Sequence, residues 1–259
     1  MVKKDWLQQT LKKLINKPIL TTRAGDAKVL IGWHKTFNLK TFPATTGKKL
    51  ILSQVSKELY CFINKLEKKE DINKHGLVIW DDNIKAANMD GIGRVYGIQW
   101  RDWDKKIDQL RESINLIKND NTSRRAIVTA WNPSEINQGC LPPCHILFQL
   151  NIVKNTLYIS VFQRSADAFL GLPFDIASYS ILARLIQNEL KLKNAKLSYY
   201  VSNLHLYMNH YEQAKECIEL KSYDYPILKL NDTIDNFHYD NVILENYNYT
   251  KFIKANMNV

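Results

Sequence analysis

Residues 163–179 read QRSADAFLGLPFDIASY, and this stretch joins the two patterns that decide the fold class. Just before it, apolar residues alternate from Leu157 to Val161, which is typical of a half-buried β-strand. At its end, apolar residues return at helical spacing, which predicts a buried helix over 176–190. A strand that leads directly into a buried helix predicts an α/β fold.

The segments before this stretch add further predicted strands. Runs rich in β-forming residues occupy 126–131 and 146–153, followed by the strand at 157–163. The dipeptide Lys154-Asn155 suits a tight turn, so the last two strands are predicted to form a hairpin. Val29-Leu30-Ile31, before Gly32, predicts a short strand nearer the N-terminus.

Helical spacing recurs at three places outside the central stretch. The first predicted helix follows Asp5, the second begins at Ser53 as its N-cap, and the third spans 108–118. Residues 65–75 are polar and predict a surface loop, whereas 221–250 predict strands and loops. With no repeat, low-complexity linker or composition shift, residues 1–259 are expected to form one α/β domain.

The composition limits the classes of function. The chain has 259 residues, 45% hydrophobic, which is typical of a globular protein able to bury a large core. A formal net charge of +10 favours an anionic partner, but the basic residues are scattered, so a nucleic-acid surface is not expected. The N-terminus is no signal peptide, and no apolar run is long enough for a membrane span, so a cytoplasmic protein is expected.

Cys144 is a candidate nucleophile in the segment Leu141-Pro142-Pro143-Cys144-His145. The two prolines hold the approach extended, so a strand should begin just after them. Taken alone, a lone cysteine is most often a small buried hydrophobe, and a thiolate needs a cationic neighbour. A deaminase-type zinc site is excluded, because position 147 is Leu and no histidine upstream of Cys144 is followed by x-Glu. We therefore expect no metal.

Residues 163–179, together with Pro143-Cys144-His145, closely resemble the signature of the thymidylate synthase family. Further motifs that match the family occur in order along the chain: Arg23-Ala24-Gly25, Glu58, Ile79-Trp80-Asp81, Val95-Tyr96-Gly97-x-Gln99-Trp100, Ser123-Arg124-Arg125 and His205-Leu206-Tyr207-x-Asn209-His210. The tail Ile253–Val259 also resembles the family's closing segment.

The resemblance implies a large mixed sheet that packs back-to-back against the same sheet of a second subunit. It also implies a homodimer whose two active sites are shared, acting on a pyrimidine deoxynucleoside monophosphate. The thiolate of Cys144 would add to C6 of the ring and make C5 nucleophilic. The carbon donor would be the reduced folate 5,10-methylenetetrahydrofolate, and the protein would be a one-carbon transferase.

The resemblance further implies a role for individual residues. The phosphate would be bound by Arg23, Arg164, Ser165 and, from the partner subunit, Arg124 and Arg125. The sugar would be bound by His205 and Tyr207. Proton transfers would involve Glu58, Tyr96 and His145. The folate would be contacted by Trp80, Asp167, Gly171 and the terminal Val259.

Asp175 departs from the family, in which thymidylate synthases carry Asn to bind the pyrimidine edge. An amide serves both N3–H and O4 of uracil, whereas a carboxylate cannot donate to O4 and can accept from the 4-amino group of cytosine. A mismatch at a buried polar site costs about 1–3 kcal/mol for each unpaired group. Asp at this position resembles the deoxycytidylate (dCMP) hydroxymethylases of the family, often found in viruses.

Two other departures agree with a cytosine substrate. Ser202-Asn203 replaces the usual Gly-Asp before His205, and Asn83 replaces a second Trp beside the folate. The tail and 170–174 remain like a thymidylate synthase. The sequence therefore favours hydroxymethylation of dCMP, with methylation of dUMP or dCMP as the alternative. A non-enzymatic RNA-binding or scaffold role is disfavoured because Cys144 and Arg164 are retained.

Overall fold

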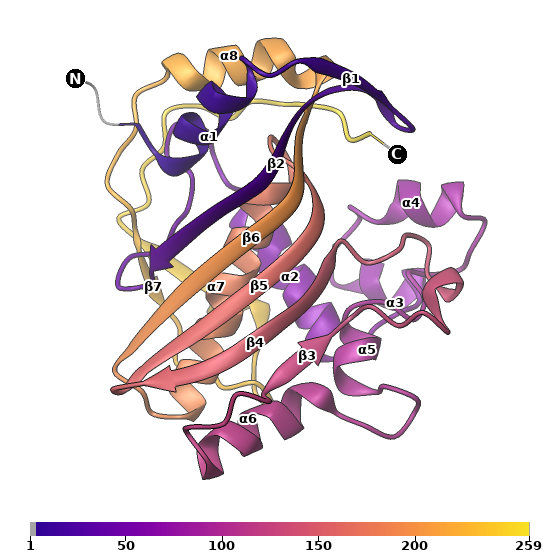
Figure 1. The fold of residues 1–259 in the computed structure, drawn as a ribbon, viewed down its shortest axis with the longest axis vertical. Coiled ribbons are helices and arrows are strands. Elements are labelled where there is room, and N and C mark those ends of the chain that lie inside the picture. Colours follow the sequence, from indigo (N-terminus) through magenta and orange to yellow (C-terminus); the bar gives the residue numbers. More distant parts are fainter. Residues whose placement is uncertain (1–3, 259) are drawn as a thin grey trace.

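The computed structural model describes residues 4–258 and is built on a mixed, six-stranded sheet in the order β1-β2-β6-β5-β4-β3 (Figure 1). Strands β5 and β6 are parallel, and the other neighbours are antiparallel. The six strands are β1 (Ile19–Thr22), β2 (Gly25–Asn38), β3 (Ile127–Thr129), β4 (His145–Val153), β5 (Thr156–Asp167) and β6 (Asn194–Tyr207). A separate antiparallel pair joins β7 (Ile227–Lys229) to β8 (Ile243–Glu245).

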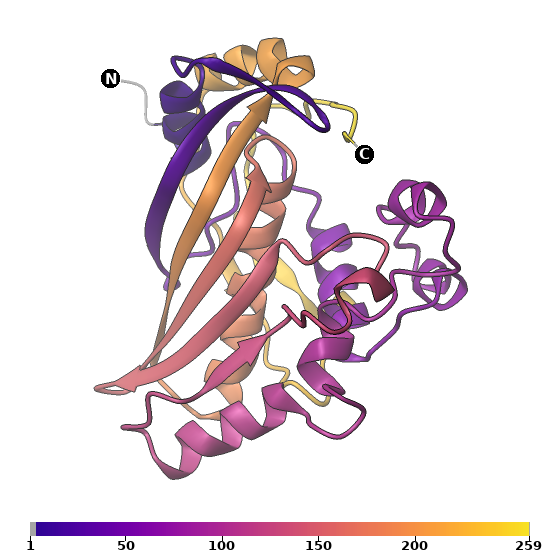
Figure 2. The same ribbon diagram turned by 45° about the vertical axis from the view of Figure 1, so that its right-hand side comes forward.

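The helices lie on one side of this sheet and at its ends (Figures 1 and 2). They are α1 (Trp6–Leu14), α2 (Leu52–Ile63), α3 (Lys69–Lys74), α4 (Asp81–Ala86), α5 (Gly97–Arg101), α6 (Gln109–Asn119), α7 (Gly171–Glu189) and α8 (Tyr211–Glu219). Three short 3₁₀ turns are η1 (Ile136–Gln138), η2 (Met208–His210) and η3 (Tyr239–Asn241). Figure 2 shows α3 and α4 on the side of the molecule away from α1 and β2.

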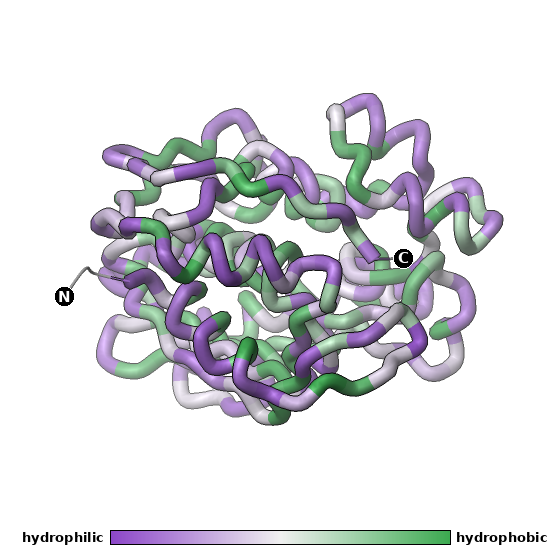
Figure 3. Tube along the Cα trace, turned by 90° about the horizontal axis from the view of Figure 1, so that it is seen from above, coloured by the Kyte–Doolittle hydropathy of each residue, from purple (hydrophilic) through white to green (hydrophobic). Residues whose placement is uncertain are grey.

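Helix α7 forms the centre of the core. It connects the parallel strands β5 and β6 and packs against both, with α2 on its other side. Burial on two sides explains why most of its residues are buried, from Leu172 to Gln187. Seen from above, hydrophilic residues mark much of the periphery, with hydrophobic residues interspersed toward the interior (Figure 3). The opposite face of the sheet is not covered by a helix in Figures 1 and 2.

The predicted α/β class and large mixed sheet are confirmed. The hairpin is confirmed as well, because Lys154 and Asn155 adopt positive φ angles of 45° and 59° between β4 and β5. Helix α1 begins as expected, since the Asp5 carboxylate accepts from the backbone of Gln8 and the Gln8 side chain accepts from the backbone of Asp5.

Three local predictions are wrong. The first strand is longer than Val29–Ile31, because Gly32 at φ 73° lets β2 continue to Asn38. The loop expected at 65–75 contains the short helix α3. Helix α2 begins at Leu52 without a side-chain cap, so Ser53 lies inside the helix rather than at its N-cap. Within residues 4–258, no helix combines the length and apolar character needed to cross a membrane.

The close approach of α5 to α2 leads to a prediction about stability. A Cβ at Gly97 would lie 2.0 Å from the carbonyl oxygen of Phe62, so Gly97→Ala must push the two helices apart. We expect a loss of about 1–3 kcal/mol in the free energy of unfolding, measured by urea denaturation. Gly171→Ala is the control, because its nearest new neighbours would be 3.8 Å away. Equal stability of the Gly97 variant and wild type would contradict the packing.

Candidate active site

A pocket of about 820 Å³ opens between α2, the N-terminus of α7, the ends of β5 and β6, and the C-terminal segment. It brings together most of the residues singled out from the sequence, which come from distant parts of the chain. These are Arg23, Glu58, Trp80, Tyr96, Cys144, His145, Arg164, Ser165, Asp167, Gly171, Asp175, His205 and Tyr207. Their proximity makes one connected site, while the role of each remains a prediction.

Cys144 lies immediately before β4, where the two prolines lead into the strand as expected. Its backbone N–H donates to the Tyr96 hydroxyl at 2.9 Å. Burial raises the pKa of the Cys144 thiol, while the nearby Arg164 charge opposes the rise and Asp175 adds to it. The expected thiolate is therefore not the resting form at neutral pH, and the thiol must lose its proton when it reacts.

Arg164 is held beside Cys144 by backbone carbonyls. Its Nε donates to the carbonyl of Pro143 at 2.9 Å and its Nη2 to that of Pro142 at 2.8 Å. The guanidinium also lies over the Trp131 ring, 5.8 Å from the centroid. These two hydrogen bonds and the contact with the ring fix the position of the Arg164 guanidinium before any ligand binds.

Asp175 is bound on both carboxylate oxygens by donors from the sheet. Its Oδ1 lies 3.1 Å from Nε2 of His145, and its Oδ2 accepts from Nε2 of Gln163 at 2.8 Å. Gln163 is oriented in turn by the Tyr199 hydroxyl, which donates to its Oε1 at 2.7 Å. The position of the Asp175 carboxylate is thus set by a chain of hydrogen bonds across β4, β5 and β6.

Glu58 is buried on α2 near Asp175. Burial, and secondarily the charge of Asp175, raises its pKa to about 8, while the Trp80 indole N–H, which donates to Oε1 at 2.9 Å, has the opposite effect. At neutral pH the group is therefore mostly the neutral acid. A carboxyl group with a pKa near the working pH can donate a proton as the acid and take one up as the carboxylate, which suits acid–base catalysis.

Asp167 and His210 connect the pocket to the C-terminal segment. Asp167 accepts from the backbone N–H of Phe169 at 2.8 Å, and its Oδ2 lies 3.5 Å from Nδ1 of His210. Burial disfavours a charge on His210, but the Asp167 carboxylate and the Asn256 carbonyl outweigh it and raise the pKa. The His210 ring therefore joins Asp167 to the tail.

The C-terminal segment is docked over the pocket. The Asn256 carbonyl lies 2.7 Å from Nε2 of His210, and the Asn258 side chain donates to the carbonyl of Ala24 at 3.1 Å. Ile253 is buried, and residues from Phe252 to Asn258 line the pocket. The segment thus forms one wall of the site. Val259, the predicted last contact, lies outside the described residues.

The remaining ligand-binding candidates surround the open part of the pocket. His205 is packed edge-on against Tyr207 at 4.7 Å between ring centroids, and burial lowers its pKa. Arg23 is exposed in the turn between β1 and β2. A Cβ at Gly171 would meet only ordinary contacts within the protein, so any need for glycine there would come from a bound ligand.

Arg124 and Arg125 are set apart from the other candidates. Both are exposed just before β3, and neither is among the residues that line the pocket of their own chain. This placement is compatible with the prediction that they act on a second subunit. Within residues 4–258, no group of three or more His, Cys, Asp or Glu side chains is arranged to hold a metal ion.

Gln163 and Tyr199 are site residues for which the sequence analysis assigned no role. A signal for Gln163 was present, because the alternation of Leu157, Ile159 and Val161 places it on the same buried face. A polar residue that continues an apolar face must find a hydrogen-bond partner, and here the partners are Asp175 and Tyr199.

Comparison with known proteins identifies the family. The family described as thymidylate synthase matches residues 6–259. The chain belongs to the thymidylate synthase family. It is similar to a thymidylate synthase of Buchnera aphidicola subsp. Baizongia pistaciae (strain Bp), with 39% identity over 234 residues, which cover 87% of this chain and 88% of that protein.

Membership of the thymidylate synthase family confirms the general chemistry. The protein is a one-carbon transferase that modifies C5 of a pyrimidine nucleotide, with methylenetetrahydrofolate as cosubstrate. The pocket suits such a reaction, because the Cys144 thiol, the Glu58 acid, the Asp175 carboxylate and the C-terminal tail all line it. The predicted hydroxymethylase branch is not supported by these comparisons, which favour the thymidylate synthase alternative.

The raised pKa of Glu58 gives a testable pH dependence of stability. Between about 4.5 and about 8, the folded protein keeps a proton that the unfolded chain has released. This contribution to stability is complete below the pKa of Glu58 in the unfolded chain, about 4.5. It is lost as the pH rises through the pKa of Glu58 in the folded protein, about 8. Relative to Glu58→Gln, wild type should lose thermal stability from pH 5 to pH 8. A difference in Tm that does not change with pH would refute the raised pKa.

Proposed function

We propose that the protein methylates C5 of 2′-deoxyuridine monophosphate (dUMP) to give the thymine nucleotide. The methylene of 5,10-methylenetetrahydrofolate would supply the carbon, and a hydride from the same folate would reduce it, leaving dihydrofolate. The observation that carries this proposal is the C-terminal segment docked over the pocket. The similarity to a thymidylate synthase supports the same reaction.

Hydride transfer requires a site from which water is excluded, because water competes for the same electrophilic carbon. The docked tail helps to meet this requirement, since Ile253 is buried and the tail residues line the pocket. Hydroxymethylation needs the opposite, a water that reaches the carbon before the hydride does. The docked tail therefore supports methylation over the hydroxymethylation that the sequence favoured.

We assign the covalent step to Cys144, whose sulfur would add to C6 of the pyrimidine. The adjacent Arg164 guanidinium would stabilise the thiolate as it forms and bind the nucleotide phosphate, with Arg23 and Ser165 as further phosphate ligands. Removal of the C5 proton would be assisted by Tyr96, whose hydroxyl is already fixed at Cys144. His205 and Tyr207 would bind the sugar.

The uracil base can be accommodated despite Asp175. The carboxylate can accept a hydrogen bond from N3–H, although it cannot donate to O4 as an amide would. Glu58, which is mostly protonated at neutral pH, can supply the missing donor on the O4 side, directly or through water. His145 holds Asp175 in place. Trp80, Asp167 and Gly171 would contact the folate.

A second candidate, the hydroxymethylation of dCMP, is favoured by one observation. The Asp175 carboxylate contacts Gln163 and His145, which fix its position. A carboxylate in this position can accept from the 4-amino group of cytosine. Asn83 also lines the pocket and could orient a water near the folate. These features rank the cytosine reaction second.

We also propose a homodimer with shared sites. The sheet face without helices exposes Ile31 and Val153, both more than half exposed at 66% and 52%, which suits burial against another copy. Arg124 and Arg125 are exposed and do not line their own pocket, and they would reach the partner's phosphate site. Because the pocket draws on residues from Arg23 to Asn258, we treat residues 1–259 as one catalytic domain.

The choice of base can be tested with C5-tritiated dUMP and dCMP assayed side by side with methylenetetrahydrofolate. Wild type should release tritium faster from dUMP and show the rise in ultraviolet absorbance that accompanies folate oxidation. Asp175→Asn should increase the preference for dUMP by roughly 5- to 150-fold, equivalent to about 1–3 kcal/mol. Faster release from dCMP, with hydroxymethyl-dCMP as product and no folate oxidation, would establish the second candidate instead.

The shared site can be tested by mixing two inactive variants, Arg125→Ala and Cys144→Ala. In each heterodimer, the Arg125→Ala subunit would supply an intact Cys144 and the Cys144→Ala subunit would supply an intact Arg125. These two residues would meet at one of the two sites, so one site is intact. With equal mixing and full exchange, about a quarter of wild-type sites should be active. Mixtures that stay inactive after exchange has been demonstrated by mass spectrometry would argue for a site contained in one chain.

A further inference from the structure

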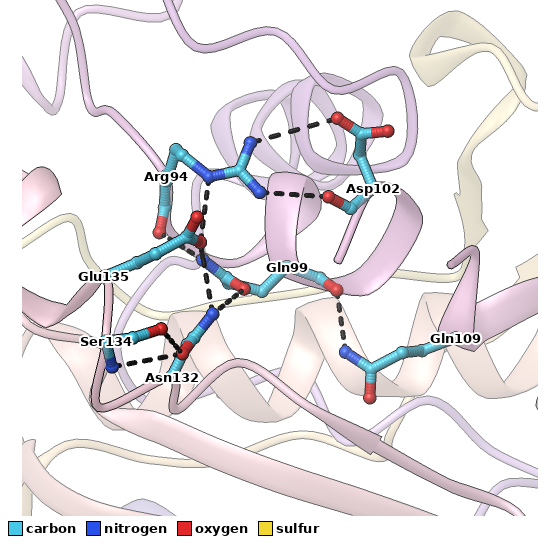
Figure 4. Close-up of polar contacts among 7 residues, drawn as sticks. All are labelled: Arg94, Gln99, Asp102, Gln109, Asn132, Ser134 and Glu135. Atoms are coloured by element: carbon cyan, nitrogen blue, oxygen red, sulfur yellow. Dashed lines mark hydrogen bonds and ion pairs between the residues drawn. The ribbon is translucent and has the colours of Figure 1, made fainter. Parts of the chain in front are cut away.

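Two loops that carry the reacting groups are tied together by a buried polar cluster outside the pocket (Figure 4). One loop, residues 92–102, contains Tyr96 and includes the short helix α5, and the other, residues 131–143, includes η1 and leads into Cys144. We call the connecting side chains the Glu135 cluster, defined by its members Arg94, Gln99, Asn132 and Glu135. None of the four lines the pocket, so the cluster is separate from the groups assigned above.

Glu135 is the centre of this cluster. Its Oε2 accepts from Nε2 of Gln99 at 2.7 Å and from Nδ2 of Asn132 at 3.1 Å, and it pairs with Nε of Arg94 at 2.8 Å (Figure 4). Gln99 is fully buried, and its Nε2 also donates to the carbonyl of Arg94 at 2.9 Å. A single carboxylate oxygen therefore joins donors from both loops.

The charge of Glu135 is stable near neutral pH. Burial alone would raise its pKa, but the Gln99 amide and the Arg94 guanidinium outweigh burial and lower it. The ion pair with Arg94 is consequently present throughout the neutral range. A neutral side chain of the same shape would keep the packing and lose part of this attraction.

Tyr96 lies between Arg94 and Gln99 in the chain, and its backbone is strained. Tyr96 has φ 40° and ψ −101°, a conformation that costs a residue with a side chain about 1–3 kcal/mol and persists only when its surroundings hold it. Its hydroxyl accepts from the backbone N–H of Cys144, which lies at the end of the other loop. The cluster thus clamps the segment on both sides of the strained residue.

Backbone hydrogen bonds also connect the two loops. The backbone N–H of Cys140 donates to the carbonyl of Ile92 at 3.0 Å, and that of Arg94 donates to the carbonyl of Gln138 at 3.2 Å. These bonds fix the ends of the loops, whereas Glu135 fixes their middle. Only the side-chain cluster can be weakened by substitution without removing backbone hydrogen bonds.

We propose that Glu135 is a positioning residue, which holds the Tyr96 hydroxyl at the distance from Cys144 that removal of the C5 proton requires. The inference rests on the C5 chemistry and on the role proposed above for Tyr96. Glu135 touches neither nucleotide nor folate in this assignment. It acts through the backbone on either side of Tyr96, and the proposed phosphate ligands Arg23 and Ser165 lie outside both loops, whereas Arg164 contacts the second loop through Pro142 and Pro143.

The test compares Glu135→Gln and Glu135→Ala with wild type, on whichever of dUMP and dCMP wild type accepts. Misplacement by about 1 Å can cost roughly 100-fold in rate. We expect tritium release from C5 to slow by about 10- to 100-fold in Glu135→Ala and by less in Glu135→Gln, with a smaller change in the nucleotide Kd than in the rate. Rates are normalised to folded protein by active-site titration, so partial unfolding does not imitate the effect.

Glu189→Gln is the matched control. Glu189 is a similarly half-buried carboxylate paired with an arginine, Arg111, but it lies at the far end of α7. The Glu189→Gln substitution should change the thermal stability without changing the rate of tritium release for each folded site. A loss of rate equal to that of Glu135→Gln would show that any lost ion pair has this effect, and would overturn the proposal.

A double-mutant cycle with Tyr96→Phe separates positioning from general damage. If Glu135 acts through the Tyr96 hydroxyl, adding Glu135→Ala to Tyr96→Phe should cause little further loss of tritium release. Multiplicative losses would overturn the proposal. The outcome is independent of the base and of the product, so a failure here is distinct from a failure of the proposed dUMP methylation.

Discussion

The pairing register of strands β4, β5 and β6 is the constraint on which the site depends. His145 is paired with Gln163, and Asp167 is paired with His205, so the reacting and the ligand-binding ends of three strands meet at one edge. The turn from β5 into α7 then returns Asp175 to the same place, where Gln163 binds it. A slip of one residue would turn every one of these side chains to the opposite face.

Two carboxyl groups, the buried Glu58 and the partly buried Asp175, define the electrostatics at this edge. Asp175 is bound by two donors, whereas Glu58 is mostly desolvated and is pushed further toward the neutral acid by the Asp175 charge. Two carboxyl groups in different environments can thus perform different tasks, Asp175 as a hydrogen-bond acceptor and Glu58 as an acid. Burial and the Asp175 charge raise the pKa of the Cys144 thiol, whereas the Arg164 charge lowers it.

Much of the fold can be predicted from local sequence patterns, because alternation and helical spacing report which face is buried. The strand β6 was not predicted, although Leu197, Tyr199 and Val201 are buried at alternate positions, which is the same kind of pattern as in β5. The site residues were found through family motifs. Gln163 and Glu135 received no role, because their partners are distant in the chain and no local pattern marks a long-range hydrogen bond.

The central claim is that Cys144 is the nucleophile that attacks the pyrimidine. The most direct measurement is the mass of the intact protein after incubation with 5-fluoro-dUMP and methylenetetrahydrofolate, followed by peptide mapping, because fluorine at C5 cannot leave as the proton does and the adduct persists. We predict one covalent nucleotide–folate adduct on Cys144, absent from Cys144→Ala. An adduct on Cys140, or bound nucleotide without any covalent bond, would contradict the account.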